Sequence, residues 1–287
     1  QLDRSTLADW VGRAAWYLRP LRDHILERLR RSERLFADET TAPVLDPGRG
    51  RTKTGQLWAY ARDDRPWGGD DPPMVAYVYA ADRKGERAEA HLGDFAGILQ
   101  VDGYGGYAAL AKRRQQISLA FCWAHVRRDF LEAGRAFAEL EPWALEWKEQ
   151  IGTLYHLNRQ RLERWDRERP LAQQSAAFAR YHEALQAQLQ RMHEEAIRSV
   201  APQRVVVQND EGAHREGATL SKSAHTRQKK VLASLLEHWP GLTVFVEHPQ
   251  APMDNNLAEN TIRTPVNGRK NYYGSGSIWS ADLAAML

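Results

Sequence analysis

The stretch GILQVDGYGGY, residues 97–107, reads as a short apolar strand that ends in an aspartate and a glycine-rich turn. Asp102 follows an apolar run that should be buried, so its carboxylate is poorly placed to act only as solubilising charge. We expect it to face a cation, a partner group or a cleft. The glycines fit no G-x-G-x-x-G helix start, and we interpret them as a turn rather than a phosphate-binding loop.

Further strands and two short helices are predicted around this stretch. Apolar or alternating runs predict strands at 33–45, 56–64, 74–82 and 116–125, and helices are expected at 83–95 and 107–114. Between the first two strands, DPGRGRTKTG (46–55) has turn chemistry. The order β-β-β-α-β-α-β predicts an α/β fold with a mixed five-stranded sheet flanked by helices.

The rest of the chain is mainly helical. Residues 1–31 form an N-terminal helical segment that Pro20 should kink or divide. We expect residues 32–122 to form the first part of the sheet domain and 123–240 to form a helical insertion. Residues 241–287 should then complete the sheet domain.

Composition bounds the class of protein. The 287 residues are 43% hydrophobic and 27% charged with a net charge of +3, so the chain should fold around a core and favours an acidic partner only weakly. A single cysteine excludes a disulfide framework and favours a reducing, cytoplasmic compartment. No apolar run is long enough to span a bilayer, and the start has no signal-peptide core. Lacking an initial Met, the chain is expected to be cut from a longer one.

Three acids stand in matching contexts. Asp38 lies in the first strand, in LFADET, and Asp102 ends the fourth, so adjacent strands would bring both within reach of one metal. Glu259, in PMDNNLAENTIR (252–263), would come from a helix packed across the sheet edge. Such hard oxygen ligands suit Mg²⁺ or Mn²⁺, and a pair of ions about 4 Å apart can act on a phosphodiester.

Each acid also has a simpler interpretation. A single aspartate at a strand end is commonly a turn or cap residue, and Glu259 alone is a solvated helix residue. Asp254 or Asn255 could cap that helix, although the spacing from Asp254 to Glu259 is not that of a capping box.

Several motifs together resemble the IS66-family bacterial transposases, from about residue 33 to the C-terminus. They are ADETTAPVLDPGRGRTKTGQLWAYARDDRPWGGDDPP, LQVDGYGGY, CWAHVRRDF, MDNNLAENTIR and GRKNYYGSGS. The resemblance implies an RNase H-like fold and DDE chemistry, with Asp38, Asp102 and Glu259 matching the family's acids. The helical block resembles the all-α insertion of several such transposases. After the glutamate this chain reads IRT where the family reads IRP, with Pro265 one place later.

Supporting residues are proposed around these acids. Cys122 and His125 form C-x-x-H, which resembles a signature of several DDE transposases. The alternative is a buried strand cysteine and a histidine that opens a helix. Asn255 and Asn256 could cap the helix, or Asn256, one turn before Glu259, could face the cleft as a support of the site. Arg263, four residues after Glu259, could pair with that carboxylate or contact phosphate.

Two basic stretches are candidate DNA contacts. Arg49, Arg51 and Lys53 lie in the predicted hairpin turn, and Arg269 and Lys270 lie in NGRKN. Charge runs are commonly solvated faces, but near a phosphodiester-cutting site they can bind phosphate.

The combined prediction is the catalytic core of a DDE transposase. It would be a Mg²⁺-dependent (or Mn²⁺-dependent) enzyme with two ions that cleaves and transfers strands at insertion-sequence ends. Its partners would be transposon-end and target DNA, on which it would form a homo-oligomer in the bacterial cytoplasm, at the nucleoid and not at a membrane. One alternative is a catalytically silent DNA-binding remnant, which would differ from the enzyme by showing no metal-dependent nicking of DNA. Another is a helical interaction protein that binds no Mg²⁺.

Overall fold

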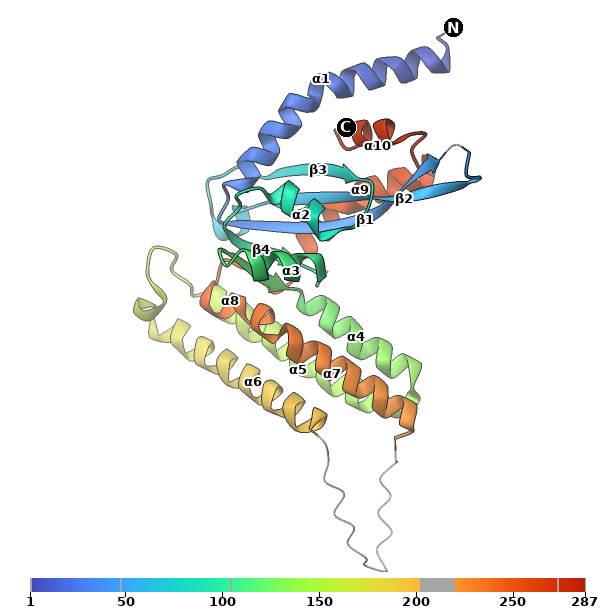
Figure 1. The fold of residues 1–287 in the computed structure, drawn as a ribbon. Coiled ribbons are helices and arrows are strands. Elements are labelled where there is room, and N and C mark those ends of the chain that lie inside the picture. The colour runs from blue at the N-terminus through green and yellow to red at the C-terminus, as the bar shows by residue number, and fades with distance from the viewer. Residues whose placement is uncertain (1, 47, 104, 202–219, 273, 287) are drawn as a thin grey trace, which may run out of the picture. The chain divides into compact units, whose positions relative to one another are not determined.

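The computed structural model describes residues 2–46, 48–103, 105–201, 220–272 and 274–286 (Figure 1). The chain divides into two compact units, each described by itself. The first comprises Gln1–Cys122 and Gln250–Leu287, and the second comprises Trp123–Pro249. The second unit is therefore formed by one continuous stretch that separates the two segments of the first.

The first unit is built on a five-stranded sheet with strand order β3-β2-β1-β4-β5. The β1–β2 and β2–β3 pairs are antiparallel, whereas the β1–β4 and β4–β5 pairs are parallel. This confirms the predicted mixed sheet flanked by helices. Its elements are α1 (Arg4–Arg30), β1 (Arg34–Asp46), β2 (Arg51–Arg62), the short 3₁₀ helix η1 (Arg65–Trp67), β3 (Met74–Ala80), α2 (Gly85–Leu92), β4 (Gly97–Val101), α3 (Gly105–Arg113), β5 (Ile117–Phe121), α9 (Asn256–Tyr272) and α10 (Ile278–Ala284).

Alternate residues of β1 face two different helical layers. Leu35 and Ala37 belong to a core that they share with buried residues of α1, α2 and α3. Phe36 instead packs with Ala258 of α9 on the other face of the sheet. Because successive strand side chains point to opposite faces, β1 is buried on both sides at this level. Each such large apolar side chain contributes about 1.5–3 kcal/mol by its burial.

The hairpin between β1 and β2 is tighter than the sequence predicts. The turn was expected over 46–55, but pairing continues to Asp46 opposite Arg51, so residues 51–55 belong to β2. The short connection is possible because Gly48 and Gly50 take positive φ angles of 88° and 63°, which glycine adopts without steric cost. Residues 51–55 are therefore of types common in turns but lie in a strand.

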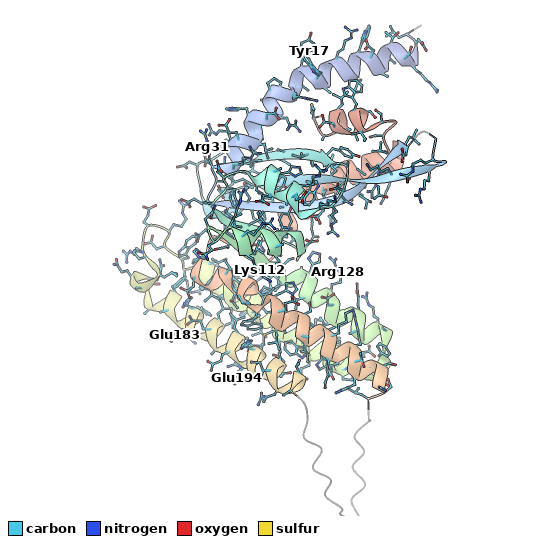
Figure 2. The ribbon with its side chains drawn as sticks, in the orientation of Figure 1. Tyr17, Arg31, Lys112, Arg128, Glu183 and Glu194 are labelled. Atoms are coloured by element: carbon cyan, nitrogen blue, oxygen red, sulfur yellow. The ribbon has the colours of Figure 1, made fainter. Side chains whose placement is uncertain are left out.

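The helix α1 runs without a break from Arg4 to Arg30, with Pro20 inside it. The proline therefore does not divide the segment, and Figure 1 shows a single bent ribbon, as expected where one helical N–H is missing. Its C-terminal part, with Leu26 and Leu29, is buried in the sheet core. Tyr17 in its N-terminal half is 74% exposed (Figure 2).

The second unit is helical in its described part. Four long helices pack in the order α4–α5–α6–α7, and α7 also contacts α4. In α6, buried Leu185, Leu189 and Met192 follow helical spacing, while Glu183 and Glu194 project to solvent (Figure 2). Its elements are α4 (Trp123–Ala136), η2 (Ala138–Leu140), α5 (Glu141–Leu162), η3 (Leu171–Gln173), α6 (Ala176–Val200), α7 (Lys222–Leu242) and α8 (Val244–Glu247).

One predicted domain boundary differs from the structure. The sequence-based boundary at residue 240 falls inside α7, and residues 241–249 belong to the second unit.

None of the described helices combines the length and apolar character that crossing a membrane requires.

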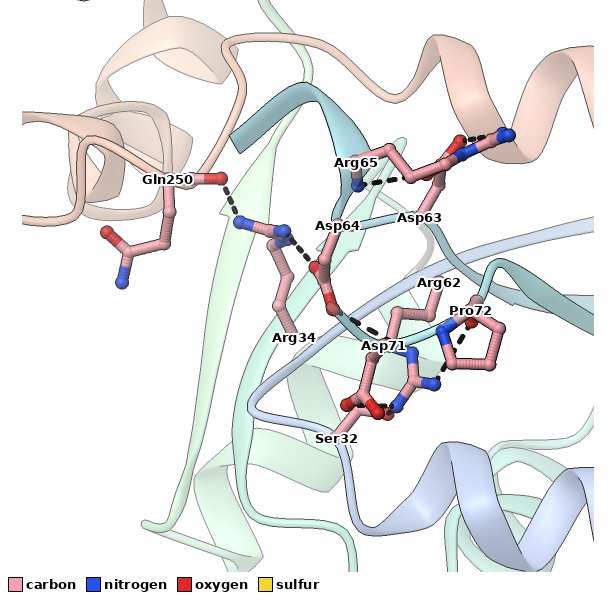
Figure 3. A network of polar contacts seen from close by, with 9 residues as sticks. All are labelled: Ser32, Arg34, Arg62, Asp63, Asp64, Arg65, Asp71, Pro72 and Gln250. Atoms are coloured by element: carbon pink, nitrogen blue, oxygen red, sulfur yellow. Dashed lines mark hydrogen bonds and ion pairs between the residues drawn. The ribbon is translucent and has the colours of Figure 1, made fainter. Parts of the chain in front are cut away.

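A network of buried arginines fixes the point where the chain returns to the first unit (Figure 3). Arg34, at the start of β1 and 5% exposed, donates to the carbonyl oxygen of Gln250 and to the carboxylate of Asp64. Arg62 donates to Ser32 Oγ at 2.9 Å. Since a buried arginine is stable only with such partners, the network holds the returning segment beside β1.

Candidate metal centre

The parallel pairing of β1 and β4 brings Asp38 and Asp102 to the same level of the sheet. The pairing register places Phe36 opposite Gln100, and each aspartate follows two residues later on its own chain. One carboxylate oxygen from each lies within 4.8 Å of the other. The geometric expectation from the sequence, that adjacent strands bring these two acids together, is therefore met.

A third acid lies at this point, Glu39, which was not predicted from the sequence. One of its carboxylate oxygens also lies within 4.8 Å of ligand atoms from both aspartates. Its Oε1 accepts a hydrogen bond from Arg83 Nε at 2.8 Å, and the Glu39 side chain is 1% exposed. The signal was present in the sequence, because Glu39 shares the strand phase of the core residues Leu35 and Ala37.

Glu259 approaches the same acids from the helix side. It lies in the first turn of α9, next to Ala258, which packs on Phe36 of β1. Asp38 has the strand phase of Phe36 and so faces α9. The charge of Glu259 contributes to raising the pKa of Asp38, which places the two carboxylates within electrostatic reach of each other.

The site has the electrostatics of a crowded group of acids. Burial, followed by the charge of Asp102, raises the pKa of Asp38 to about 7, and the charges of Glu39 and Glu259 add to this. The Glu39 backbone N–H donates to Asp38 Oδ1 at 2.8 Å and opposes the shift. Burial also raises the pKa of Asp254, despite a hydrogen bond from the Asn256 N–H, and the charge of Glu259 adds to it. Like charges gathered in a buried place are relieved by protonation or by a bound cation.

The donor set fits a hard divalent ion. Asp102 Oδ1 and Glu39 Oε2 are buried and have no hydrogen-bond partner among the described residues. A buried carboxylate oxygen without a donor is costly unless a cation satisfies it. Carboxylate oxygens are the ligands preferred by Mg²⁺ and Mn²⁺. The residues present therefore suit such an ion.

Asn255 ties the segment before α9 to the sheet. It is fully buried, and its Nδ2 donates to the carbonyl oxygen of Ala37, the residue before Asp38, at 2.9 Å. Its backbone N–H donates to Cys122 Sγ at 3.3 Å, and its carbonyl oxygen accepts from the Glu259 N–H at 3.1 Å. Asn255 thus connects the backbones that carry two of the acids.

Asn255→Leu is expected to lower the free energy of unfolding by about 1–3 kcal/mol, because the Ala37 carbonyl loses its buried donor. Displacement of Glu259 should also weaken Mn²⁺ binding. Chemical denaturation and calorimetry measure the two effects. The control is Asn256→Ala, since Asn256 is exposed. Equal unfolding free energies for the two variants would contradict a role for Asn255.

The remaining predicted supports are distributed as follows. Cys122 is buried and accepts the Asn255 N–H, consistent with the simpler interpretation of a buried cysteine at the end of a strand. His125 lies in α4 of the second unit. Asn256 and Arg263 are exposed on α9, so the Asn256 side chain is not enclosed beside the acids.

The basic residues of the hairpin lie far from the acids. Arg49, Arg51 and Lys53 are exposed at its tip, where Arg49 pairs with Asp46 at 3.1 Å. Lys53 lies opposite Val44, six residues beyond Asp38 on β1, which corresponds to about 20 Å. These side chains cannot contact the same phosphate as the carboxylates.

Arg269 and Lys270, at the other end of α9, differ from each other. Arg269 donates to Thr41 Oγ1 at 2.8 Å and also to the Thr41 carbonyl oxygen, which fastens α9 to β1. Lys270 is exposed. Of the two, Lys270 is the one placed to meet an anion from solvent.

Comparison with known proteins points to one family. A family model described as Transposase IS66 family matches residues 1–283. "Uncharacterized protein y4jD" and "Uncharacterized protein y4hP" of Sinorhizobium fredii are 35% and 33% identical to the chain over its whole length. "Uncharacterized protein y4qI" of the same organism is 51% identical over 46% of the chain and 26% of its own length. The chain spans about half of the first two relatives, 51% and 49% of their lengths. No solved structure matches it.

Proposed function

Because the chain belongs to the IS66 transposase family, we propose that its first unit is the RNase H-like catalytic core of a DDE transposase. The observation that carries the proposal is that carboxylate oxygens of Asp38, within β1, and of Asp102, just after β4, lie within 4.8 Å of each other, while the charge of Glu259 on α9 acts on Asp38. The strand order β3-β2-β1-β4-β5 with its antiparallel β1–β2–β3 half supports the RNase H-like assignment. In this proposal the second unit is an all-α insertion between β5 and the glutamate helix.

The three acids would hold two Mg²⁺ or Mn²⁺ ions. When bound, such ions lower the pKa of water, polarise the phosphate and stabilise the leaving oxygen of a phosphodiester. The protein contributes the ligands and their placement. Asp38 lies within the paired strand β1, Asp102 directly follows the paired strand β4, and Glu259 lies in a helix, and rigid elements of this kind keep ligands in a defined geometry.

The reaction would proceed in two displacements at phosphorus. Water attacks a phosphodiester at the transposon end, the bond to the 3′ oxygen breaks, and that oxygen leaves as a 3′-hydroxyl. The freed 3′-hydroxyl then attacks a phosphodiester of target DNA, and the target's own 3′ oxygen leaves. One phosphodiester bond breaks for each one formed in the second displacement, so no further energy source is required.

DNA would be held by basic side chains at a distance from the acids. The phosphates are repelled by the carboxylates, so positive charge must compensate. Arg263 and Lys270 are exposed on α9, on the helix that carries Glu259. The hairpin residue Lys53 lies about 20 Å from Asp38 along β1, which equals about six base pairs of duplex, so we assign the hairpin to the flanking DNA. The complex with transposon-end and target DNA would be a homo-oligomer at the bacterial nucleoid.

The raised pKa of Asp38 predicts that ion binding depends on pH. An aspartate with a pKa of about 7 must lose a proton to become a ligand, so Mn²⁺ affinity should fall about tenfold per pH unit below pH 7. Calorimetry in buffers of different ionisation enthalpy should show about one proton released per binding event at pH 6 and fewer at pH 8. Proton release that does not change with pH would contradict the prediction.

The raised pKa of Asp38 also determines how the stability of the metal-free protein changes with pH. Between pH 3.8 and about 7 the folded protein holds a proton that the unfolded chain has lost, so the metal-free protein should lose stability as pH rises through this window. Added Mn²⁺ should reverse that loss, because it compensates the ionised carboxylate.

The function is tested with a supercoiled plasmid that carries the ends of the genetic element encoding the chain. The protein, with Mg²⁺ or Mn²⁺, should nick the plasmid at those ends, and EDTA should stop the reaction. A DNA-binding remnant would shift the same DNA in a gel without nicking it in any metal. That second result would contradict the proposed catalysis.

A further inference from the structure

Glu39 is built into the site in a way that an ordinary ion pair does not explain. Its side chain is 1% exposed, and its Oε1 accepts from Arg83 Nε at 2.8 Å, with a second, shorter contact from Arg83 Nη2. Its Oε2 is buried without a hydrogen-bond partner among the described residues. The guanidinium therefore satisfies one oxygen of the carboxylate and leaves the other unsatisfied.

The surroundings of that carboxylate are acidic. Ligand oxygens of Glu39, Asp38 and Asp102 all lie within 4.8 Å of one another. Repulsion between them opposes folding, so stability alone gives no reason to gather three acids around a single arginine. Arg83 is itself exposed at its far side, with 48% of its side chain accessible. A cation in the middle of this group would give Glu39 Oε2 the partner that it lacks among the described residues.

Strand geometry explains how two neighbouring residues can serve one ion. Asp38 and Glu39 leave β1 on opposite faces, one towards α9 and the other towards α2 and α3. Asp102 follows β4, beyond its last strand residue Val101. Its carboxylate can therefore lie between the two, and the three acids surround a point at the sheet edge.

We infer that Glu39 is a further metal ligand of this centre, through Oε2, and that Arg83 is the positioning residue that holds Oε1. This inference rests on the proposed metal-dependent function. It assigns to the site a fourth carboxylate besides Asp38, Asp102 and Glu259. In this inference the positive charge of Arg83 balances the Glu39 carboxylate and keeps the Glu39 side chain in one orientation.

The test is calorimetric titration of the whole chain with Mn²⁺. Glu39→Gln keeps the shape and removes the charge, and it should weaken Mn²⁺ binding by about tenfold or more, in the range known for residues that support metal sites. Glu86→Gln is the control, because Glu86 is exposed in the first turn of α2 and should leave the affinity unchanged. Asp102→Asn provides the reference for loss of a ligand.

A second variant keeps the inference testable if Glu39→Gln does not fold. Arg83→Met removes the counter-ion from an exposed position, so the Glu39 carboxylate should depend more on the ion. Mn²⁺ should then raise the midpoint of thermal unfolding more in Arg83→Met than in the unaltered protein. An equal rise in both proteins would overturn the inference.

The outcomes separate this inference from the function on which it rests. If the unaltered chain binds Mn²⁺ and Glu39→Gln binds it within twofold of the same affinity, Glu39 is only the structural partner of Arg83. If the unaltered chain binds no Mn²⁺ at all, the metal centre of the proposed function fails, and the role of Glu39 fails with it.

Discussion

Asp102→Asn is expected to abolish metal-dependent nicking of transposon-end DNA, with a loss of at least about a thousandfold, while the fold remains intact. The substitution keeps the shape of the side chain and removes a charged oxygen ligand. Metal ions contribute several kcal/mol to stabilising the transition state of such reactions, and about 4 kcal/mol corresponds to a thousandfold in rate. The buried Asp102 Oδ1, which lacks a donor among the described residues, is the atom whose role is tested.

Stability distinguishes a lost ligand from a damaged fold. Removing one of several crowded negative charges should leave the metal-free protein as stable as before, or more stable, in EDTA. The matched control is Asp94→Asn, because Asp94 is exposed and precedes the opposite end of β4. Retained nicking by Asp102→Asn, or equal loss in Asp94→Asn, would contradict the assignment of Asp102.

The part of the site that strand order determines could be predicted from the sequence. An acid after each of two buried apolar runs, with crossover helices between the later strands, places Asp38 and Asp102 at one sheet edge once β1 and β4 are neighbours. Glu259 depended on the family motif, since a glutamate in a helix carries no local sign of its tertiary partner. The structure brings its charge to Asp38.

Glu39 could not be predicted from a position at a strand end, because only its strand phase marks it. The strongest feature of ADET is Asp38, and its neighbour points to the other face of the sheet. Yet Glu39 continues the phase of Leu35 and Ala37, so it is an acid on a buried face. An acid at a strand position that points to the same face as buried apolar residues is the pattern that identifies Glu39.

Other features depend on tertiary placement that the sequence does not encode locally. Arg269 reads as one of two basic residues in NGRKN, but the path of α9 brings its guanidinium to Thr41 on β1. The buried Arg161 of α5 gives no local signal either, because it reads as one of several arginines in a polar helix. Its carbonyl partners lie 84 and 85 residues away in sequence, so no local pattern announces them.

Arg161 is a fully buried charged residue of the second unit. It is 0% exposed, and its Nη1 and Nη2 donate to the carbonyl oxygens of Val246 at 2.9 Å and Phe245 at 2.8 Å. Its guanidinium also lies 5.9 Å from the ring centre of Phe178. Burial lowers the pKa of Arg161 to about 10, partly opposed by the charge of Glu247, so the side chain remains charged at neutral pH.

Arg161→Met is expected to reduce the free energy of unfolding of the second unit by about 3–5 kcal/mol, as when one partner of a buried charged interaction is removed. Two carbonyl groups of α8 lose their donors, and methionine replaces only the apolar part of the side chain. Arg161→Lys should recover part of the loss, because an ammonium cannot donate to both carbonyls with the fixed fork of a guanidinium. Urea denaturation gives the magnitude, and hydrogen exchange at α5 and α8 amides locates it.

Arg159→Met is the control on the same helix, since Arg159 is exposed and should change stability by less than about 0.5 kcal/mol. Matching denaturation midpoints for the two methionine variants would show that Arg161 does not fasten α8 to the bundle.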